Sequence, residues 1–325
     1  MKRPLLEVKN LKLHFPIDKG LLEKEQKYVK AIDGVNFSIY ENETFGLVGE
    51  SGCGKSTTGK AIMKLIDPTD GEVIFRGKDI SKYSRKEMRN VYKNIQLIFQ
   101  DPFASLNPRK SVGKIIEEPL IVNSNLDSKA RKQRVHELLE LVGLHAYHST
   151  RYPHEFSGGQ RQRVGIARAL ALNPKIIIAD EAVSALDVSI QSQVLNLLRK
   201  LQRELGLTYL FISHDLSVVK HISDKIGVMY LGKIIEQGTK DSVYAKPLHP
   251  YTQALLSASP TISSENRQER IVLKGDMPSP ANPPTGCAFH PRCFAAKPEC
   301  KMVQPELRDV GDGHFVACHL YNEQV

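Results

Sequence analysis

The sequence predicts an α/β fold with a mainly parallel sheet, and three observations support this prediction. Short apolar segments of strand length alternate with segments of helical periodicity. The strand expected at residues 44–48 ends in a glycine-rich turn that opens a helix. The strand expected at residues 175–180 is apolar almost throughout, as in strands buried on both faces of a parallel sheet, and it ends in acidic residues.

Length and composition favour an ordinary globular protein. The 325 residues suggest about two domains, and the chain is 41% hydrophobic and 25% charged. Its apolar segments are far shorter than the roughly 20 residues that span a bilayer. The N-terminal residues lack the apolar segment of a signal peptide. We therefore expect the protein to remain in the cytoplasm.

The net charge of +9 is compatible with nucleic acid or anionic lipid as a partner. The basic residues, however, are spread in short groups such as Ser84–Arg89 and Lys129–Arg134. We interpret these groups as solvated helix faces, with lipid head groups or nucleic acid as the alternative.

The first part of the chain is predicted to be rich in β-strands. Leu5–Phe15 and Ala31–Tyr40 alternate apolar and polar residues, as half-buried strands do, and a lysine-rich loop is expected between them at 16–28. Further strands are expected at 71–80 and 94–100, and a helix from Lys55.

In the middle of the chain the predicted secondary structure changes from strands to helices. Helical periodicity dominates residues 110–170, with Asp127 or Ser128 as a cap, which indicates a helical insertion. The α/β alternation then resumes with a helix at Val188–Leu205 and strands at 207–213 and 225–238. A linker-like run at 275–286 and a cluster of cysteines predict a small C-terminal module.

Residues 49–56 match the phosphate-binding pattern G-x-x-x-x-G-K-[ST], between a predicted strand and a predicted helix. Glycines let backbone N–H groups surround phosphates, and a helix N-terminus adds partial positive charge. Lys55 would reach the β- and γ-phosphates, and Ser56 would ligate Mg²⁺. We interpret Cys53 as a small loop residue without a redox role. The candidate nucleotide-binding residues are Gly49, Ser51, Gly52, Cys53, Gly54, Lys55, Ser56 and Thr57.

Two acidic residues follow the apolar strand at 175–180, at the sheet edge where ligands bind in such folds. Asp180 would hold Mg²⁺ through water, and Glu181 would polarise the attacking water as a general base. A strand followed by a capping acid is the alternative reading of this pair.

The segment Ser157-Gly158-Gly159-Gln160 lies between the phosphate-binding motif and the acidic strand. Ser157 is suited to cap the helix that follows, and the glycines allow close approach to a phosphate. In this position the segment resembles the signature sequence of ABC ATPases. The resemblance extends over almost the whole chain and implies the ABC ATPase fold, with an antiparallel β subdomain.

The resemblance also implies roles for further residues. Gln100 looks like the Q-loop glutamine that touches Mg²⁺ or water, Asp187 closes a D-loop, and His214 looks like the switch histidine that contacts the γ-phosphate. Such ATPases form head-to-tail dimers that sandwich two ATP molecules. The signature residues Ser157 and Gly159 would then serve the partner's ATP, and ATP would close the dimer that hydrolysis reopens.

Three stretches are similar to the ATPases of oligopeptide and dipeptide importers, of the F-subunit type: 101–109, 151–155 and 248–256. That resemblance implies an ATPase domain at 1–257, with a helical subdomain at about 103–170, and a C-terminal peptide-importer module at 258–325. It implies a peripheral place on the cytoplasmic face of the membrane. Cargo would be peptides or related molecules such as nickel chelates.

The implied partners are two integral membrane permease subunits, docked around residues 100–125, and a second, homologous ATPase, although a homodimer could form in isolation. An extracellular peptide-binding protein would act indirectly. Two alternative functions remain. One is an ABC protein that acts on nucleic acid, and the other is an ATPase for iron–sulfur cluster assembly. The single ATPase module without a coiled-coil insertion argues against nucleic acid, and the importer stretches argue against cluster assembly.

One residue departs from the family pattern, and one loop leaves a family position ambiguous. Ala182 stands where the family usually has proline, which should loosen one turn and leave the chemistry intact. Because of the loop at 16–28, the position of the aromatic residue that stacks on adenine is ambiguous. We predict that Tyr28 fills this role, with Phe15 as the alternative.

Four of the five cysteines, Cys287, Cys293, Cys300 and Cys318, lie close together near the C-terminus. Four thiols in a small cytoplasmic module suit Zn²⁺ or an iron–sulfur cluster, although the spacing differs from that of common zinc ribbons. Resemblance to peptide-importer ATPases implies a 4Fe–4S cluster, with Zn²⁺ or reduced structural thiols as the alternatives.

Overall fold

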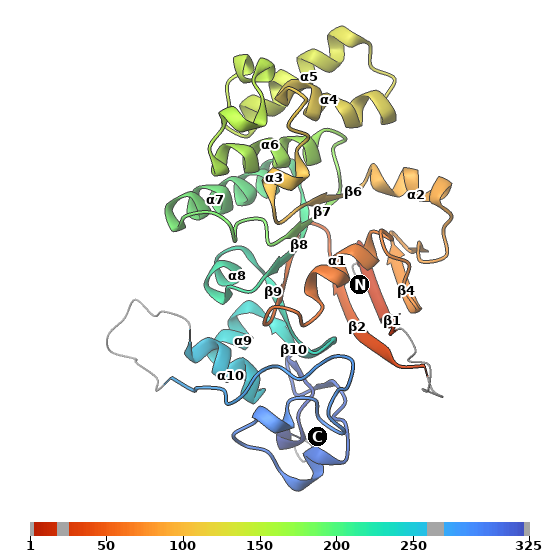
Figure 1. The fold of residues 1–325 in the computed structure, drawn as a ribbon, viewed down its shortest axis with the longest axis vertical. Coiled ribbons are helices and arrows are strands. Elements are labelled where there is room, and N and C mark those ends of the chain that lie inside the picture. Colours follow the sequence, from red (N-terminus) through yellow and green to blue (C-terminus); the bar gives the residue numbers. More distant parts are fainter. Residues whose placement is uncertain (1–2, 18–25, 259–269, 322–325) are drawn as a thin grey trace. The chain divides into compact units, whose positions relative to one another are not determined.

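The computed structural model describes residues 3–17, 26–258 and 270–321 (Figure 1). The chain divides into two compact units. The first unit comprises Met1–Tyr40, Thr44–Lys82 and Ser213–Val325, and the second comprises Glu41–Glu43 and Tyr83–Ile212.

The first unit contains an antiparallel sheet in the order β2-β1-β4-β5. Its strands are β1 (Leu6–Pro16), β2 (Tyr28–Ile39), β4 (Asp70–Phe75) and β5 (Lys78–Asp79). Apolar residues of β1 and β2 alternate into the core, as the sequence pattern predicts. We expected one strand at 71–80. The chain instead turns back at Arg76 and Gly77, both with positive φ, and so forms a β4–β5 hairpin.

The same unit holds the parallel pair β3 (Thr44–Val48) and β9 (Lys225–Tyr230). Antiparallel strands β10 (Lys233–Thr239), β12 (Phe315–Val316) and β11 (Arg308–Asp309) extend it in that order. The helices described in this unit are α1 (Lys55–Ile62), α8 (Leu216–Ile222), α9 (Lys240–Ala245) and α10 (Pro250–Ser257), with the 3₁₀ helices η4 (His290–Arg292), η5 (Pro298–Lys301) and η6 (His319–Tyr321).

The second unit contains three parallel strands, β6 (Ile95–Ile98), β7 (Ile176–Asp180) and β8 (Thr208–Ser213, of which Ser213 belongs to the first unit), with β7 in the middle. Every residue of β7 is buried, as its apolar sequence predicts. Helices α2 (Arg85–Tyr92), α3 (Pro102–Ser105), α4 (Val112–Asn123), α5 (Ser128–Leu141), α6 (Gly158–Leu170) and α7 (Val188–Leu205), with the 3₁₀ helices η1 (Ala146–Thr150) and η2 (Pro153–Glu155), complete the unit.

Local sequence signals set several helix ends in this unit. Asp127 caps α5 by accepting the Ala130 N–H at 2.8 Å, which decides between the two expected caps. Gly206 ends α7 in the left-handed conformation, so this helix has the bounds that its periodicity predicts. Helices α4, α5 and α6 contact one another and form the expected helical insertion (Figure 1).

A buried carboxylate ties the C-terminal residues to β10. Glu236 is fully buried and accepts hydrogen bonds from the N–H groups of Leu248 and His249, each at 2.8 Å. His314, just before β12, lies 2.8 Å from the same carboxylate. Because a buried charge is costly unless paired, these bonds hold the start of α10 and the C-terminal strand against β10.

His249 begins α10 as a neutral base. It is buried, and its Nδ1 atom accepts the N–H of Tyr251 at 3.0 Å. Burial lowers the pKa of His249 to about 4, although the nearby Glu236 acts in the opposite direction. Protonation is therefore much easier in the unfolded chain, whose histidine pKa is about 6.5.

We expect this histidine to make folding pH-dependent. Since its folded pKa is lowered, its stabilisation is present above about pH 6.5 and is lost as the pH falls toward 4, with about 2 kcal/mol lost at pH 5. In His249→Asn, the amide oxygen can cap α10 without titrating. Urea unfolding at pH 7.5 and pH 5 should show a smaller loss for this variant than for the wild type. An equal loss in both would contradict the assignment.

Candidate functional site

The phosphate-binding loop, or P-loop, lies in the first unit between β3 and α1, where the sequence predicts it. Gly54 directly precedes α1 with a φ of 108°, which only glycine adopts readily. A Cβ atom there would lie 2.2 Å from the carbonyl oxygen of Ala31, and one on Gly49 would lie 2.2 Å from that of Met229. The loop is thus fixed between β2 and β9 by contacts that exclude any side chain.

Lys55 is the buried cation of this loop. Its Nζ atom donates to the carbonyl oxygens of Gly49 and Glu50, at 2.8 and 2.9 Å. Lys55 also opens α1, so its charge and the helix N-terminus act at one place. This is the arrangement that binds nucleotide phosphates.

The other predicted P-loop residues differ in accessibility. Ser51 and Gly52 are exposed, whereas Ser56 and Thr57 are half-buried in the first turn of α1. Cys53 is buried, and burial raises the pKa of its thiol, which disfavours the reactive thiolate. Cys53, which we interpret as a small loop residue, is therefore packed inside the loop.

The first unit also carries His214 and the aromatic candidates. His214 is exposed just after β8, followed by Asp215, whose carboxylate caps α8 by accepting the Ser217 N–H at 2.8 Å. Tyr28 starts β2 and is 45% exposed, while Phe15 near the end of β1 is 39% exposed. Both aromatic side chains are accessible, so stacking on adenine stays a prediction for Tyr28.

The second unit brings Gln100 and Glu181 together. The Gln100 side-chain amide donates to the Glu181 carboxylate at 2.7 Å. Asp180 is buried at the end of β7. Glu181 follows with a φ of 46°, a left-handed conformation that is uncommon outside glycine and concentrates at functional sites.

Hydrogen bonds on both sides hold this strained residue in place. The Glu181 N–H donates to Ile212 at 2.9 Å, and the Glu181 carbonyl accepts the Ser184 N–H at 3.1 Å. Ala182 is buried in the same turn, which therefore forms without the family's proline. The sequence did not reveal the left-handed backbone at Glu181, because a glutamate gives no sequence signal for that conformation.

The predicted signature segment opens α6. Ser157 and Gln160 form a reciprocal cap, because the Ser157 hydroxyl accepts the Gln160 N–H at 3.3 Å and the Gln160 side chain accepts the Ser157 N–H at 3.0 Å. A Cβ atom on Gly159 would lie 2.4 Å from the Ile190 side chain of α7. Gly158 follows Ser157 as the first residue of α6, and Asp187 stands just before α7.

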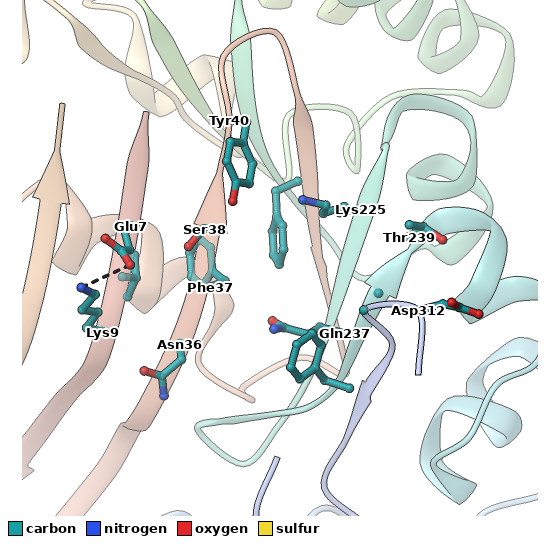
Figure 2. A pocket seen from close by; sticks show the side chains of 15 residues that line it. Glu7, Lys9, Asn36, Phe37, Ser38, Tyr40, Lys225, Gln237, Thr239 and Asp312 are labelled. Atoms are coloured by element: carbon teal, nitrogen blue, oxygen red, sulfur yellow. Dashed lines mark ion pairs between the residues drawn. The ribbon is translucent and has the colours of Figure 1, made fainter. Parts of the chain in front are cut away.

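A cavity of about 680 Å³ lies elsewhere in the first unit (Figure 2). Phe37 and Phe45 stack in its wall with ring centroids 4.8 Å apart, and the Lys225 ammonium lies 4.7 Å from the ring centroid of Tyr40. None of the predicted site residues lines this cavity. The predicted site therefore lies outside this cavity.

The four C-terminal cysteines are free thiols that lie near one another. Each is within electrostatic reach of the other three. Burial raises the pKa of Cys287, of Cys293 and, to about 11, of Cys318. Within residues 3–17, 26–258 and 270–321, no group of three or more His, Cys, Asp or Glu side chains is arranged to hold a metal ion. The expected metal-binding module is therefore not evident in the structure.

Comparison with known proteins identifies the family. The family model described as ABC transporter matches residues 32–184, and the one described as the C-terminal region of oligopeptide/dipeptide transporters matches residues 235–300. An oligopeptide transport ATP-binding protein of Bacillus subtilis, AppF, is 59% identical over 98% of each chain. The chain belongs to the ATP-binding subunits of oligopeptide and dipeptide ABC transporters.

Other relatives agree with this family. The dipeptide transport ATP-binding protein DppF of Escherichia coli is 52% identical, over 98% of this chain and 95% of its own length. A solved dimer of the ATP-binding cassette MJ0796, in a post-hydrolysis state with ADP and phosphate, is 32% identical with a TM-score of 0.63. That alignment covers 72% of this chain and 98% of the cassette. This chain accordingly has the ABC ATPase fold, and it is an ATP-hydrolysing subunit.

Glu181 offers the sharpest test of the site. In Glu181→Gln the amide cannot act as a general base, so we expect the rate of phosphate release from MgATP to fall at least about 100-fold while ATP binding is retained. Glu137→Gln, on the exposed surface of α5, is the control that should keep the wild-type rate. Near-normal turnover in Glu181→Gln would show that another group activates the water.

Proposed function

We propose that ATP hydrolysis by this chain drives the import of oligopeptides or dipeptides, or of related cargo such as nickel chelates, through an ABC transporter. The observation that supports this most is the combination, in one chain, of a formed P-loop with the C-terminal region of peptide transporters. No described helix is both long and apolar enough to cross a bilayer. In the proposed assembly, two permease subunits provide the membrane pathway, and this chain binds at their cytoplasmic side.

In the proposed reaction the P-loop binds the phosphates of ATP. Lys55 neutralises the β- and γ-phosphates, and His214 contacts the γ-phosphate. Glu181 accepts the proton of the attacking water, whose oxygen forms a bond to the γ-phosphorus as the bond to the ADP oxygen breaks. Bound Mg²⁺, held by Ser56, Gln100 and Asp180, would offset the negative charge that develops on the phosphate oxygens.

The hydrogen bond from Gln100 to Glu181 supports a role for Gln100 in controlling when ATP is hydrolysed. It fixes the carboxylate before water arrives, and Gln100 is the first residue of the segment around 100–125 to which we assign permease docking. Movement of this segment would then change the orientation of the general base. Hydrolysis would thus depend on the state of the membrane subunits.

We further propose that the chain works in a dimer with a second, homologous ATPase. The related cassette MJ0796 is dimeric. In such a dimer Ser157, Gly158, Gly159 and Gln160 would face the partner's ATP, and Asp187 would lie at the interface. The capped start of α6 suits this role, since its helix N-terminus favours an anionic ligand.

For the cysteine tail we propose a 4Fe–4S cluster bound by Cys287, Cys293, Cys300 and Cys318. The four thiols lie within electrostatic reach of one another, and four sulfur ligands suit an iron–sulfur cluster or Zn²⁺. The similarity of this tail to that of peptide-importer ATPases favours the cluster. The cluster would stabilise the C-terminal module, because its bonds to the four sulfurs would join segments that are distant in the sequence.

Import is tested in the intact assembly. Purification of this chain from its native membranes in mild detergent should recover two multi-span subunits and a second ATPase. Reconstituted in vesicles with ATP on the side of this chain, the assembly should import labelled peptide, and Glu181→Gln should abolish uptake. Recovery only with nucleic acid or with cluster-assembly proteins would contradict the transport function.

The cluster is tested by anaerobic purification of the full chain. We expect about four iron and four sulfide per chain, with visible absorption that is lost in Cys318→Ser. Cys53→Ser, which alters a cysteine outside the tail, is the matched control and should keep the iron. Zinc in place of iron, or no metal after anaerobic preparation, would refute the proposal.

A further inference from the structure

An ion pair connects the P-loop to the C-terminal part of the chain. Glu50, the residue after the first P-loop glycine, accepts two hydrogen bonds from the Arg292 guanidinium, at 2.8 and 3.2 Å. This two-point geometry is the strong form of an arginine–carboxylate pair. The backbone N–H of Glu50 donates to the Tyr251 hydroxyl at 2.8 Å. Residues from α10 and η4 thus hold Glu50 by both its backbone and its side chain.

Arg292 is fixed in its place by aromatic rings. Only 8% of its side chain is exposed, and its guanidinium carbon lies 6.0 Å from the ring centroid of Tyr230. The rings of Tyr230, Tyr251 and Phe289 pack edge to face, with centroids 4.8 to 5.4 Å apart. Burial alone would lower the pKa of Arg292, but hydrogen bonding to Glu50 outweighs it and raises that pKa.

The charge of Glu50 matters because of its position. The carbonyl oxygen of the same residue accepts a hydrogen bond from Lys55 Nζ at 2.9 Å, so the carboxylate belongs to the loop that holds the phosphate-binding cation. Without Arg292 this carboxylate would repel the phosphates of ATP and compete with them for Lys55. The paired guanidinium removes that penalty.

We propose that Arg292 is a positioning residue for nucleotide binding, which neutralises Glu50 and orients the start of the P-loop without touching ATP. Nucleotide affinity then depends on the folded C-terminal segment. Arg292 lies between Cys287 and Cys293 in a short hydrogen-bonded segment. The His290 N–H donates to the Cys287 carbonyl at 3.0 Å, and the Cys293 N–H donates to the His290 carbonyl at 3.3 Å. A displacement of this backbone would therefore reach the P-loop through Arg292 and Glu50.

Calorimetric titration of the full chain with MgADP tests the proposal, since ADP binds the P-loop without turnover. We expect Arg292→Gln to weaken MgADP binding about tenfold, because it leaves an unpaired carboxylate beside the phosphates. Combining it with Glu50→Gln removes that carboxylate, so the double variant should recover to within about threefold of the wild type. A purely structural role of Arg292 would give no such recovery.

The control is Arg308→Gln, which removes another C-terminal arginine whose ion pair with Glu306 is exposed, and it should bind MgADP like the wild type. Unchanged affinity in Arg292→Gln, or a double variant as weak as Arg292→Gln, would overturn the proposal. If Arg292→Gln does not fold, Glu50→Gln alone decides, since it leaves the Arg292 charge unpaired and should tighten binding. Weaker binding in that variant would contradict us, whereas MgADP binding by the wild type tests the P-loop itself.

Discussion

The predicted nucleotide site depends on close backbone approach at the two ends of the P-loop. Gly49 lies against the carbonyl of Met229 and Gly54 against that of Ala31, with no room for a Cβ atom at either position. These contacts fix the loop between β9 and β2, and they set the start of α1. Lys55 is consequently buried with its ammonium beside the loop carbonyls, where it can bind phosphate.

Local sequence was sufficient wherever one segment carries its own signal. The P-loop glycines, the buried strand before Asp180 and the Ser157 cap each combine residue type with spacing, and each lies where we predicted it. The β4–β5 hairpin was missed because its turn contains arginine beside glycine, which is a weaker turn signal than asparagine beside glycine.

Long-range relations could not be predicted in this way. Glu50 and Arg292 are 242 residues apart, and nothing near either residue indicates the other. The burial that raises the thiol pKa of Cys318 likewise depends on packing that no spacing rule encodes. The left-handed φ of Glu181 is accompanied by a hydrogen bond to Ile212, which is distant in the sequence and gives no local signal.

A C-terminal region that reaches the P-loop gives this family member a route by which the state of its tail can affect nucleotide binding. Hydrogen–deuterium exchange of the full chain, with and without MgADP, tests this account most directly. We predict slower exchange on MgADP binding both at residues 49–56 and at 287–293, since Glu50 and Arg292 join the two segments. Protection of residues 49–56 alone would contradict the coupling, and protection of neither segment would contradict the assigned site.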